Sequence, residues 1–194
     1  MKFTAPIISI LLVLLPSFLS AKTEISFSSQ YYSFQAHDKA SIWKGIAAKS
    51  PKVSQKDHVR HQVIVGLTEW DLRQHYRFRG SLNRCELVGA TTQLNVSIHL
   101  PYWEDKWKAP GYLQKSWDQY VRMVSDHEGI HKAYAIRTAE RIDKEVSELV
   151  HEKDCEQLKA YIDEIVQKHM QQNRLDNRWF DAKEKIYQKH AAWF

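Results

Sequence analysis

Two histidines and a glutamate form the part of this chain best suited to chemistry. The segment His127-Glu128-Gly129-Ile130-His131 has the pattern H-E-x-x-H. On a helix, residues i and i+4 lie one above the other, so both imidazoles can reach one ion, and zinc accepts such nitrogens at about 2.0–2.1 Å. Glu128 would stand beside the first ligand and accept a proton from a metal-activated water molecule. The spacing therefore predicts a Zn²⁺ site with Glu128 as the general base of a hydrolase.

A catalytic zinc site needs a third protein ligand and one open position. If the chain reverses near residues 151–155, the motif faces residues 175–181 of the returning segment. This window contains Asp176 and Asp181. We favour Asp181 as the third ligand, with Asp176 as the alternative. Either aspartate could instead be a helix cap or an ordinary surface charge, so the position stays open at this point.

The elements that must hold the motif follow from hydrophobic periodicity. Apolar residues recur at helical spacing from Leu113 to Leu149, and both motif histidines fall on that apolar side. A second helical pattern begins near Cys155 and becomes irregular at 171–177. Residues 111–194 are therefore predicted to be mainly α, with a long motif helix and a second helix antiparallel to it.

Residues 22–110 are predicted to be mainly β. Segments rich in β-branched and aromatic residues occupy 25–34, 59–67, 70–78 and 92–100, and a short helix is expected over 40–48. The last three of these strand segments alternate apolar with polar residues, which is typical of an antiparallel sheet with one covered face. The fold class is therefore α+β: an antiparallel sheet of about four strands packed on the motif helix.

The N-terminus has the features of an export signal. Lys2 precedes a short apolar run that ends at Pro16, and Leu19-Ser20-Ala21 offers a small-residue cleavage site. Residues 1–21 are expected to be a bacterial Sec-type signal peptide, with an uncleaved anchor as the alternative. Residues 22–194 then form a single periplasmic or secreted domain. No other segment is apolar enough to cross a bilayer, so no integral membrane segment is expected after cleavage.

Export has consequences for the cysteines and for the choice of partners. An oxidising compartment would let Cys85 and Cys155 pair, the alternative being two free buried thiols. The net charge is +5, and basic residues are interspersed with acidic ones. Because no basic run or stripe stands out, no nucleic-acid partner is expected.

An ordered set of short segments surrounds the motif. It comprises Tyr31-Tyr32-Ser33-Phe34, Cys85, Leu100-Pro101-Tyr102-Trp103, Trp117-Asp118-Gln119-Tyr120 and Cys155. In this order the segments resemble a bacterial family of predicted secreted zinc-dependent proteases, domain-of-unknown-function family 922. The resemblance implies a minimal zincin-like fold and a Zn²⁺ cofactor. The family typically ends in a Tyr-Asp-x-x-Thr-x-His-Gly-like segment; one alignment places Asp181 at its histidine, and another places Ile186 there.

The expected function is a secreted or periplasmic zinc-dependent metallopeptidase that acts on a peptide or protein substrate in the cell envelope. The first alternative is a non-catalytic envelope-binding module with a structural or vestigial metal site, which a closed set of four protein ligands would favour. The second is a metal-free binding domain whose histidines only pack. An edge strand could hold an extended peptide. His99, Tyr102 and Trp103 either border that cleft or serve as packing residues. The sequence does not define the oligomeric state.

Overall fold

The computed structural model of the protein describes residues 21–51, 63–81, 84–149 and 154–188. The elements follow in the order β1 (Ala21–Phe34), α1 (Lys39–Lys49), β2 (Leu67–Ser81), β3 (Arg84–Trp103), the 3-10 helix η1 (Lys106–Lys108), α2 (Gly111–Ser147) and α3 (Cys155–Gln188). The α+β class is confirmed. Residues 1–20 of the predicted signal peptide lie outside the described residues. None of the described helices is both long and apolar enough to cross a membrane.

The described strands form one mixed sheet in the order β1-β3-β2. β2 pairs antiparallel with β3, whereas β1 pairs parallel with β3 along its whole length. The all-antiparallel prediction is therefore wrong for the β1–β3 pair. β3 is the central strand, and β2 runs antiparallel to it. β1 runs in the same direction as β3, so the first and last strands in the sequence are parallel neighbours. Alternation shows which face a residue occupies, but it does not show which strand lies beside it.

One of the four predicted strands does not occur as a separate strand in the described part of the chain. Residues 59–62 of that prediction lie outside the described residues, and 63–66 have no strand conformation. Leu67 already belongs to β2. The described sheet therefore has three strands, with β2 as the antiparallel edge.

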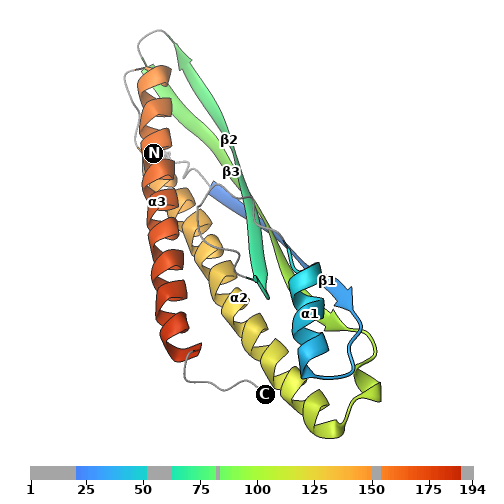
Figure 1. Cartoon of the computed structure of the whole chain (residues 1–194). Helices are drawn as coiled ribbons and strands as arrows, with labels where there is room; N and C mark the ends of the chain where they lie inside the picture. The colour runs from blue at the N-terminus through green and yellow to red at the C-terminus, as the bar shows by residue number, and fades with distance from the viewer. Residues whose placement is uncertain (1–20, 52–62, 82–83, 150–153, 189–194) are drawn as a thin grey trace, which may run out of the picture.

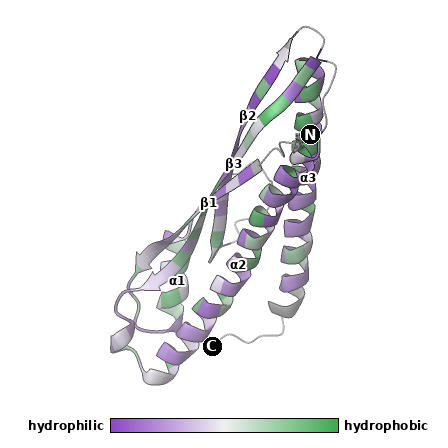
Figure 2. Ribbon diagram, turned by 180° about the vertical axis from the view of Figure 1, so that it is seen from behind, coloured by the Kyte–Doolittle hydropathy of each residue, from purple (hydrophilic) through white to green (hydrophobic). Residues whose placement is uncertain are grey.

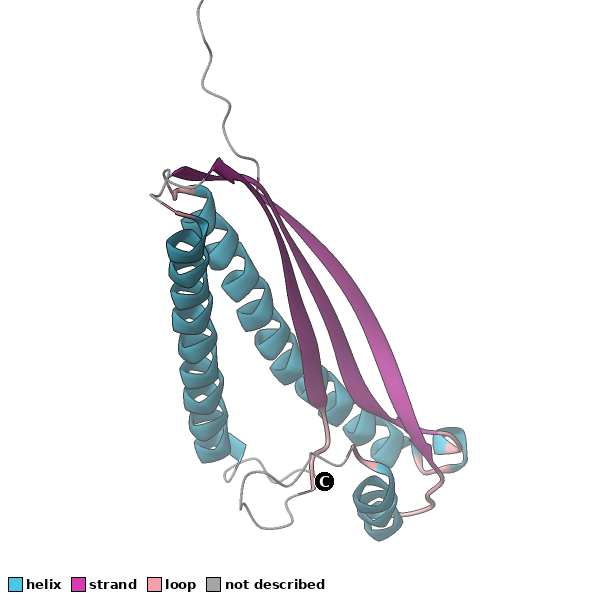
Figure 3. Cartoon of the chain, turned by 90° about the horizontal axis from the view of Figure 1, so that it is seen from above, coloured by secondary structure: helices cyan, strands magenta, loops and turns pink. Residues whose placement is uncertain are grey.

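The long helix α2 lies between the sheet and α3 (Figures 1 and 3). Figure 2 shows hydrophilic and hydrophobic residues alternating along both long helices, as expected for amphipathic helices. On the sheet side, α2 packs on the buried face of β3, which includes Leu94, Val96 and Ile98. The buried carboxylate of Asp143 accepts hydrogen bonds from Thr23 of β1 and from a β3 threonine. This carboxylate ties α2 to two strands at once.

The helix α3 continues through residues 171–177, where the apolar pattern of the sequence is irregular. The apolar pattern fails there because the buried position is polar. Asn173 is only 4% exposed, and its amide donates a hydrogen bond to Thr138 of α2 over 2.9 Å. Hydrogen bonding replaces apolar packing at this contact between the helices.

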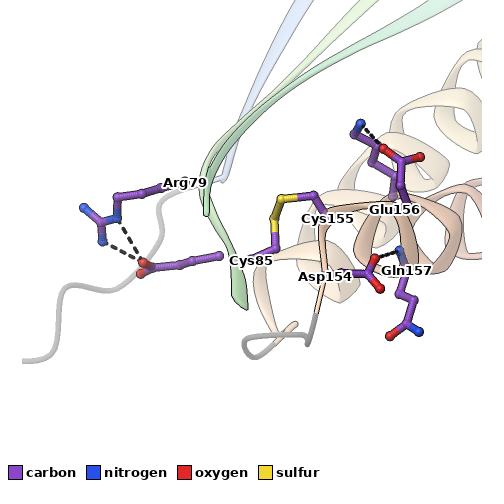
Figure 4. Close-up of a disulfide and its surroundings, with 8 residues drawn as sticks. Arg79, Cys85, Asp154, Cys155, Glu156 and Gln157 are labelled. Atoms are coloured by element: carbon purple, nitrogen blue, oxygen red, sulfur yellow. Dashed lines mark hydrogen bonds and ion pairs between the residues drawn. A yellow bond between two sulfur atoms is a disulfide. The ribbon is translucent and has the colours of Figure 1, made fainter. Parts of the chain in front are cut away.

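A disulfide between Cys85 and Cys155 confirms that predicted pair. It joins the start of β3 to the first residue of α3 (Figure 4). Next to it, the Asp154 carboxylate accepts a hydrogen bond from the backbone N–H of Gln157 over 2.8 Å, as an N-terminal helix cap does. The bridge therefore fixes where α3 begins relative to the sheet.

Replacing both cysteines by serine is expected to lower the free energy of unfolding by about 4 kcal/mol, because the bridge spans 70 residues of sequence. Urea unfolding followed by circular dichroism measures the difference. Dithiothreitol should bring the parent protein to the same value and leave the double variant unchanged. A loss below about 1 kcal/mol would contradict this stabilising role.

Candidate metal centre

The two motif histidines lie one turn apart on α2, on the side that faces α3. Their ring centroids are 4.8 Å apart, and their Nε2 atoms are 3.1 Å apart. The His127 ring also stacks on the ring of Phe180 of α3, with centroids 4.8 Å apart. Both histidine side chains are largely buried, with 19% and 14% of their surface exposed.

The helix α3 brings Asp181 to this pair. Its Oδ1 atom lies 3.4 Å from Nε2 of His127 and 3.0 Å from Nε2 of His131. The three side chains offer ligand atoms that all lie within 4.8 Å of one another. Asp176 is not part of this group; it accepts a hydrogen bond from Gln172 on its own helix over 2.8 Å. The structure thus brings together His127, His131 and Asp181 and leaves the alternative ligand apart.

A directed chain of hydrogen bonds fixes the tautomer of His131. Thr138 donates to the carbonyl of Tyr134 over 2.8 Å, and the Asn173 amide donates to Thr138. Asn177 in turn donates its amide to Oδ1 of Asn173 over 2.9 Å. The remaining oxygen of Asn177 can only accept, so Nδ1–H of His131 donates to it. In the neutral imidazole, Nε2 of His131 therefore carries the free lone pair.

A shared cation would satisfy the atoms that converge here. With neutral imidazoles, the lone pair on Nε2 of His131 points toward a carboxylate oxygen and lies close to a second imidazole nitrogen. Burial alone lowers the pKa of His131, but its hydrogen bonds to Asp181 and Asn177 and the nearby negative charges, including Glu128, outweigh burial and raise this pKa above the ordinary value. Burial raises the pKa of Asp181, yet its bonds to the two histidines hold this pKa well below its usual range. A proton or a metal ion can occupy this place.

The spacing of the donor atoms fits a tetrahedral zinc ion. Zinc–nitrogen bonds of about 2.0–2.1 Å put neighbouring ligands roughly 3.3 Å apart. The three measured separations are 3.0, 3.1 and 3.4 Å. The hydrogen bond from Nδ1 of His131 to Asn177 is the kind of second contact that orients a metal-binding imidazole. His127, His131 and Asp181 could therefore hold a divalent cation with little rearrangement.

Glu128 lies on a different side of α2 from the histidines, facing the start of β2. It is the most buried residue of the motif, at 5% exposure. The Thr68 hydroxyl lies 2.7 Å from the Glu128 carboxylate and 3.0 Å from its backbone carbonyl oxygen. Gly66 leaves room for this carboxylate, because a Cβ at that position would lie 2.7 Å from Oε1 of Glu128. The carboxylate is thus confined between α2 and the edge strand.

A cavity of about 1020 Å³ connects the two sides of α2. Glu128, both histidines and Asp181 all line it. Residues 63–68 and Trp70 line it from the β2 side, and Asn173, Arg174, Asn177 and Arg178 line it from α3. The candidate base and the candidate ligands therefore share one space large enough for a short peptide.

His99, Tyr102 and Trp103, which the sequence offered either as border residues of the cleft or as packing residues, lie elsewhere in the structure. Trp103 is 3% exposed and donates its indole N–H to the Ala36 carbonyl over 3.0 Å, so it is a packing residue. His99 pairs with Glu69 at 2.9 Å, and Tyr102 is exposed. None of the three is among the residues that line the cavity, and the packing alternative is confirmed for Trp103.

Sequence reasoning missed the residues that support the site. Thr68 and Gly66 lie far from the motif in sequence, and no local pattern marks them. Asn177 does carry a signal, because Asn173, Asn177 and Asp181 recur every four residues. This spacing places three polar side chains on one face of a helix.

The comparisons with known proteins support the family label given by the sequence resemblance and assign no activity. A family model described as a bacterial protein of unknown function, DUF922, matches residues 29–190. No curated protein matches the chain. No solved structure matches it.

Proposed function

The chain belongs to the DUF922 family of bacterial proteins of unknown function, and for this member we propose a zinc-dependent peptidase that acts outside the cytoplasm. One observation carries the proposal. Two imidazole nitrogens and a carboxylate oxygen converge at the spacing of zinc ligands, in the same cavity as a buried glutamate. The disulfide supports an oxidising compartment for the protein.

In the proposed mechanism, the residues on the two sides of α2 have different roles. A bound Zn²⁺ would polarise the substrate carbonyl and make a water molecule more acidic. Glu128 takes the proton from the attacking water and returns it to the leaving amine. Thr68, by donating to one carboxylate oxygen, holds the general base in one orientation. Asn177 holds the ring of His131 so that Nε2 faces the cation.

The number of ligands favours a catalytic over a structural role. Within the described ranges, the metal-binding group consists of three side chains, His127, His131 and Asp181. Catalytic zinc sites typically have three protein ligands and an open position, whereas structural sites have four. This composition supports the peptidase over the envelope-binding module with a structural metal.

The proposal is tested on the protein purified from periplasm without added metal. It should contain about one zinc per chain by elemental analysis and cleave an internally quenched peptide library. Removing the metal with 1,10-phenanthroline should end cleavage, and added Zn²⁺ should restore it. Metal-free protein that cleaves at the same rate would refute the role of zinc. A zinc-loaded protein that cleaves no peptide would refute the peptidase.

Replacing Gly66 by alanine is expected to lower kcat by up to about 100-fold without changing zinc affinity. The new Cβ would lie 2.6 Å from Cγ1 of Val124 and 2.7 Å from Oε1 of Glu128, so both side chains, including the proposed base, would have to shift. Displacement of a catalytic group by about 1 Å can have an effect of this size. Gly129→Ala is the matched control, because a Cβ there meets no atom within 4 Å. Equal kcat values for the two variants would show that Gly66 does not position Glu128.

A further inference from the structure

Two arginines line the proposed active-site cavity from α3. Arg174 and Arg178 are four residues apart, so they lie on one face of the helix, and Asp181 follows one turn later. All three residues line the same cavity as the motif. The two guanidinium groups therefore stand in a row that leads along α3 to the candidate metal site.

Neither arginine is neutralised by a carboxylate in the described part of the chain. Two lysines of the same helix behave differently: Lys159 pairs with Glu156 at 2.9 Å and Lys168 pairs with Glu145 at 2.6 Å. The only hydrogen bond from either guanidinium to a described residue runs from Nε of Arg178 to the carbonyl of Arg174, over 3.3 Å. Both side chains are exposed at the cavity. Their terminal nitrogens remain available to a ligand.

The opposite side of the cavity has a different character. Val63, Val65 and Trp70 line it from the segment that leads into β2 and from β2 itself. Three carboxylates also line the cavity: Glu128 from α2, and Asp181 and Glu184 from α3. The two arginines and a bound divalent cation would together outweigh these three negative charges. The cavity thus has apolar side chains on its β2 side and two arginines on its α3 side, with the candidate reacting groups between them.

From this arrangement we infer that the substrate is a peptide that carries a carboxylate close to the scissile bond, and that Arg174 and Arg178 bind that carboxylate. The inference rests on the proposed peptidase function. The guanidinium group presents paired N–H donors that match the two oxygens of a carboxylate, which makes arginine the preferred residue for this recognition. The carboxylate can belong to an Asp or Glu side chain or to the C-terminus of the substrate.

The test uses internally quenched peptides of one sequence that carry Glu, Gln or Lys at successive positions, each with a free or an amidated C-terminus. The zinc-loaded protein should cleave the best carboxylate peptide with a kcat/KM at least tenfold above its neutral counterpart. In Arg174→Gln and Arg178→Gln, this ratio should fall toward one, mainly through KM. Arg141→Gln, an exposed arginine of α2, is the matched control and should keep the ratio. Zinc affinity should be the same in all four proteins.

Binding provides a readout that does not depend on turnover. Calorimetry with the Glu128→Gln variant should show at least tenfold tighter binding of the carboxylate peptide than of the neutral one, and Arg178→Gln added to that variant should remove the difference. If amidation of the peptide C-terminus abolishes the preference, the recognised carboxylate is the C-terminus. If the preference is retained, the recognised carboxylate belongs to a side chain. Equal binding of charged and neutral peptides would overturn the inference. Absence of cleavage with preserved preferential binding would refute only the peptidase.

Discussion

Replacing Glu128 by glutamine is expected to reduce kcat by about 100- to 10,000-fold while leaving the zinc content unchanged. Glutamine has nearly the same shape as glutamate, and its amide oxygen can still accept the hydrogen bond from Thr68, which lies 2.7 Å from the carboxylate. The amide cannot take a proton from water. The substitution would therefore remove the proposed general base and change little else. Steady-state cleavage of an internally quenched peptide, together with elemental analysis, measures both quantities.

A matched substitution on the same helix serves as the control. Glu140 lies on the exposed side of α2, away from the cavity, so Glu140→Gln should cleave at the parental rate. If Glu128→Gln cleaves as fast as the parent, Glu128 is not the base and the mechanism is wrong. If the variant loses its zinc, the buried carboxylate supports the metal site instead of the proton transfer.

The second large effect is expected at Asp181. Replacing it by alanine should weaken zinc binding by more than about 100-fold, because even residues that only hydrogen-bond to a metal ligand contribute about 10- to 100-fold. The carboxylate lies 3.0 Å and 3.4 Å from the two histidine nitrogens, and nothing else on α3 belongs to the described three-residue group. Competition with a chromophoric zinc chelator gives the dissociation constant.

Two further variants test whether Asp181 is a zinc ligand or only a nearby negative charge. Asp176→Ala should bind zinc as the parent does, because Asp176 is engaged by Gln172 and lies outside the group. Asp181→His should retain much of the affinity, since histidine also offers a zinc ligand atom at this position. Loss of zinc in Asp176→Ala with retention in Asp181→Ala would reverse the assignment.

The sequence predicted those parts of the site that depend on local spacing. The four-residue step between the histidines and the continuous apolar pattern place both rings on one side of α2, where the rings are observed in contact. A simple antiparallel return then brings residues 175–181 opposite the motif, and His131 does contact both Asn177 and Asp181. Helix geometry alone was sufficient, because each of these relations depends on the rise and turn of one or two helices.

The parts that were missed depend on which elements become neighbours. A periodic stripe on α2 does not show that the helix has two partners, so Glu128 was not predicted to face the sheet while the histidines face α3. The parallel pairing of β1 with β3 was missed for the same reason. Thr68 and Gly66 reach Glu128 across 60 or more residues of sequence, and only the finished fold brings them together.

The disulfide at the start of α3 has a consequence for how the protein responds to its surroundings. Asp181 follows Cys155 by 26 residues, which corresponds to about 39 Å of helix. In the proposed metalloenzyme, α3 would be held at its first residue by the disulfide and at Asp181 by a metal ion. The disulfide requires an oxidant, and the metal contact requires zinc. Each would restrict the motion of α3 and so lower the entropy cost of forming the other. Completion of the site would thus depend jointly on the redox state and the zinc supply of the compartment.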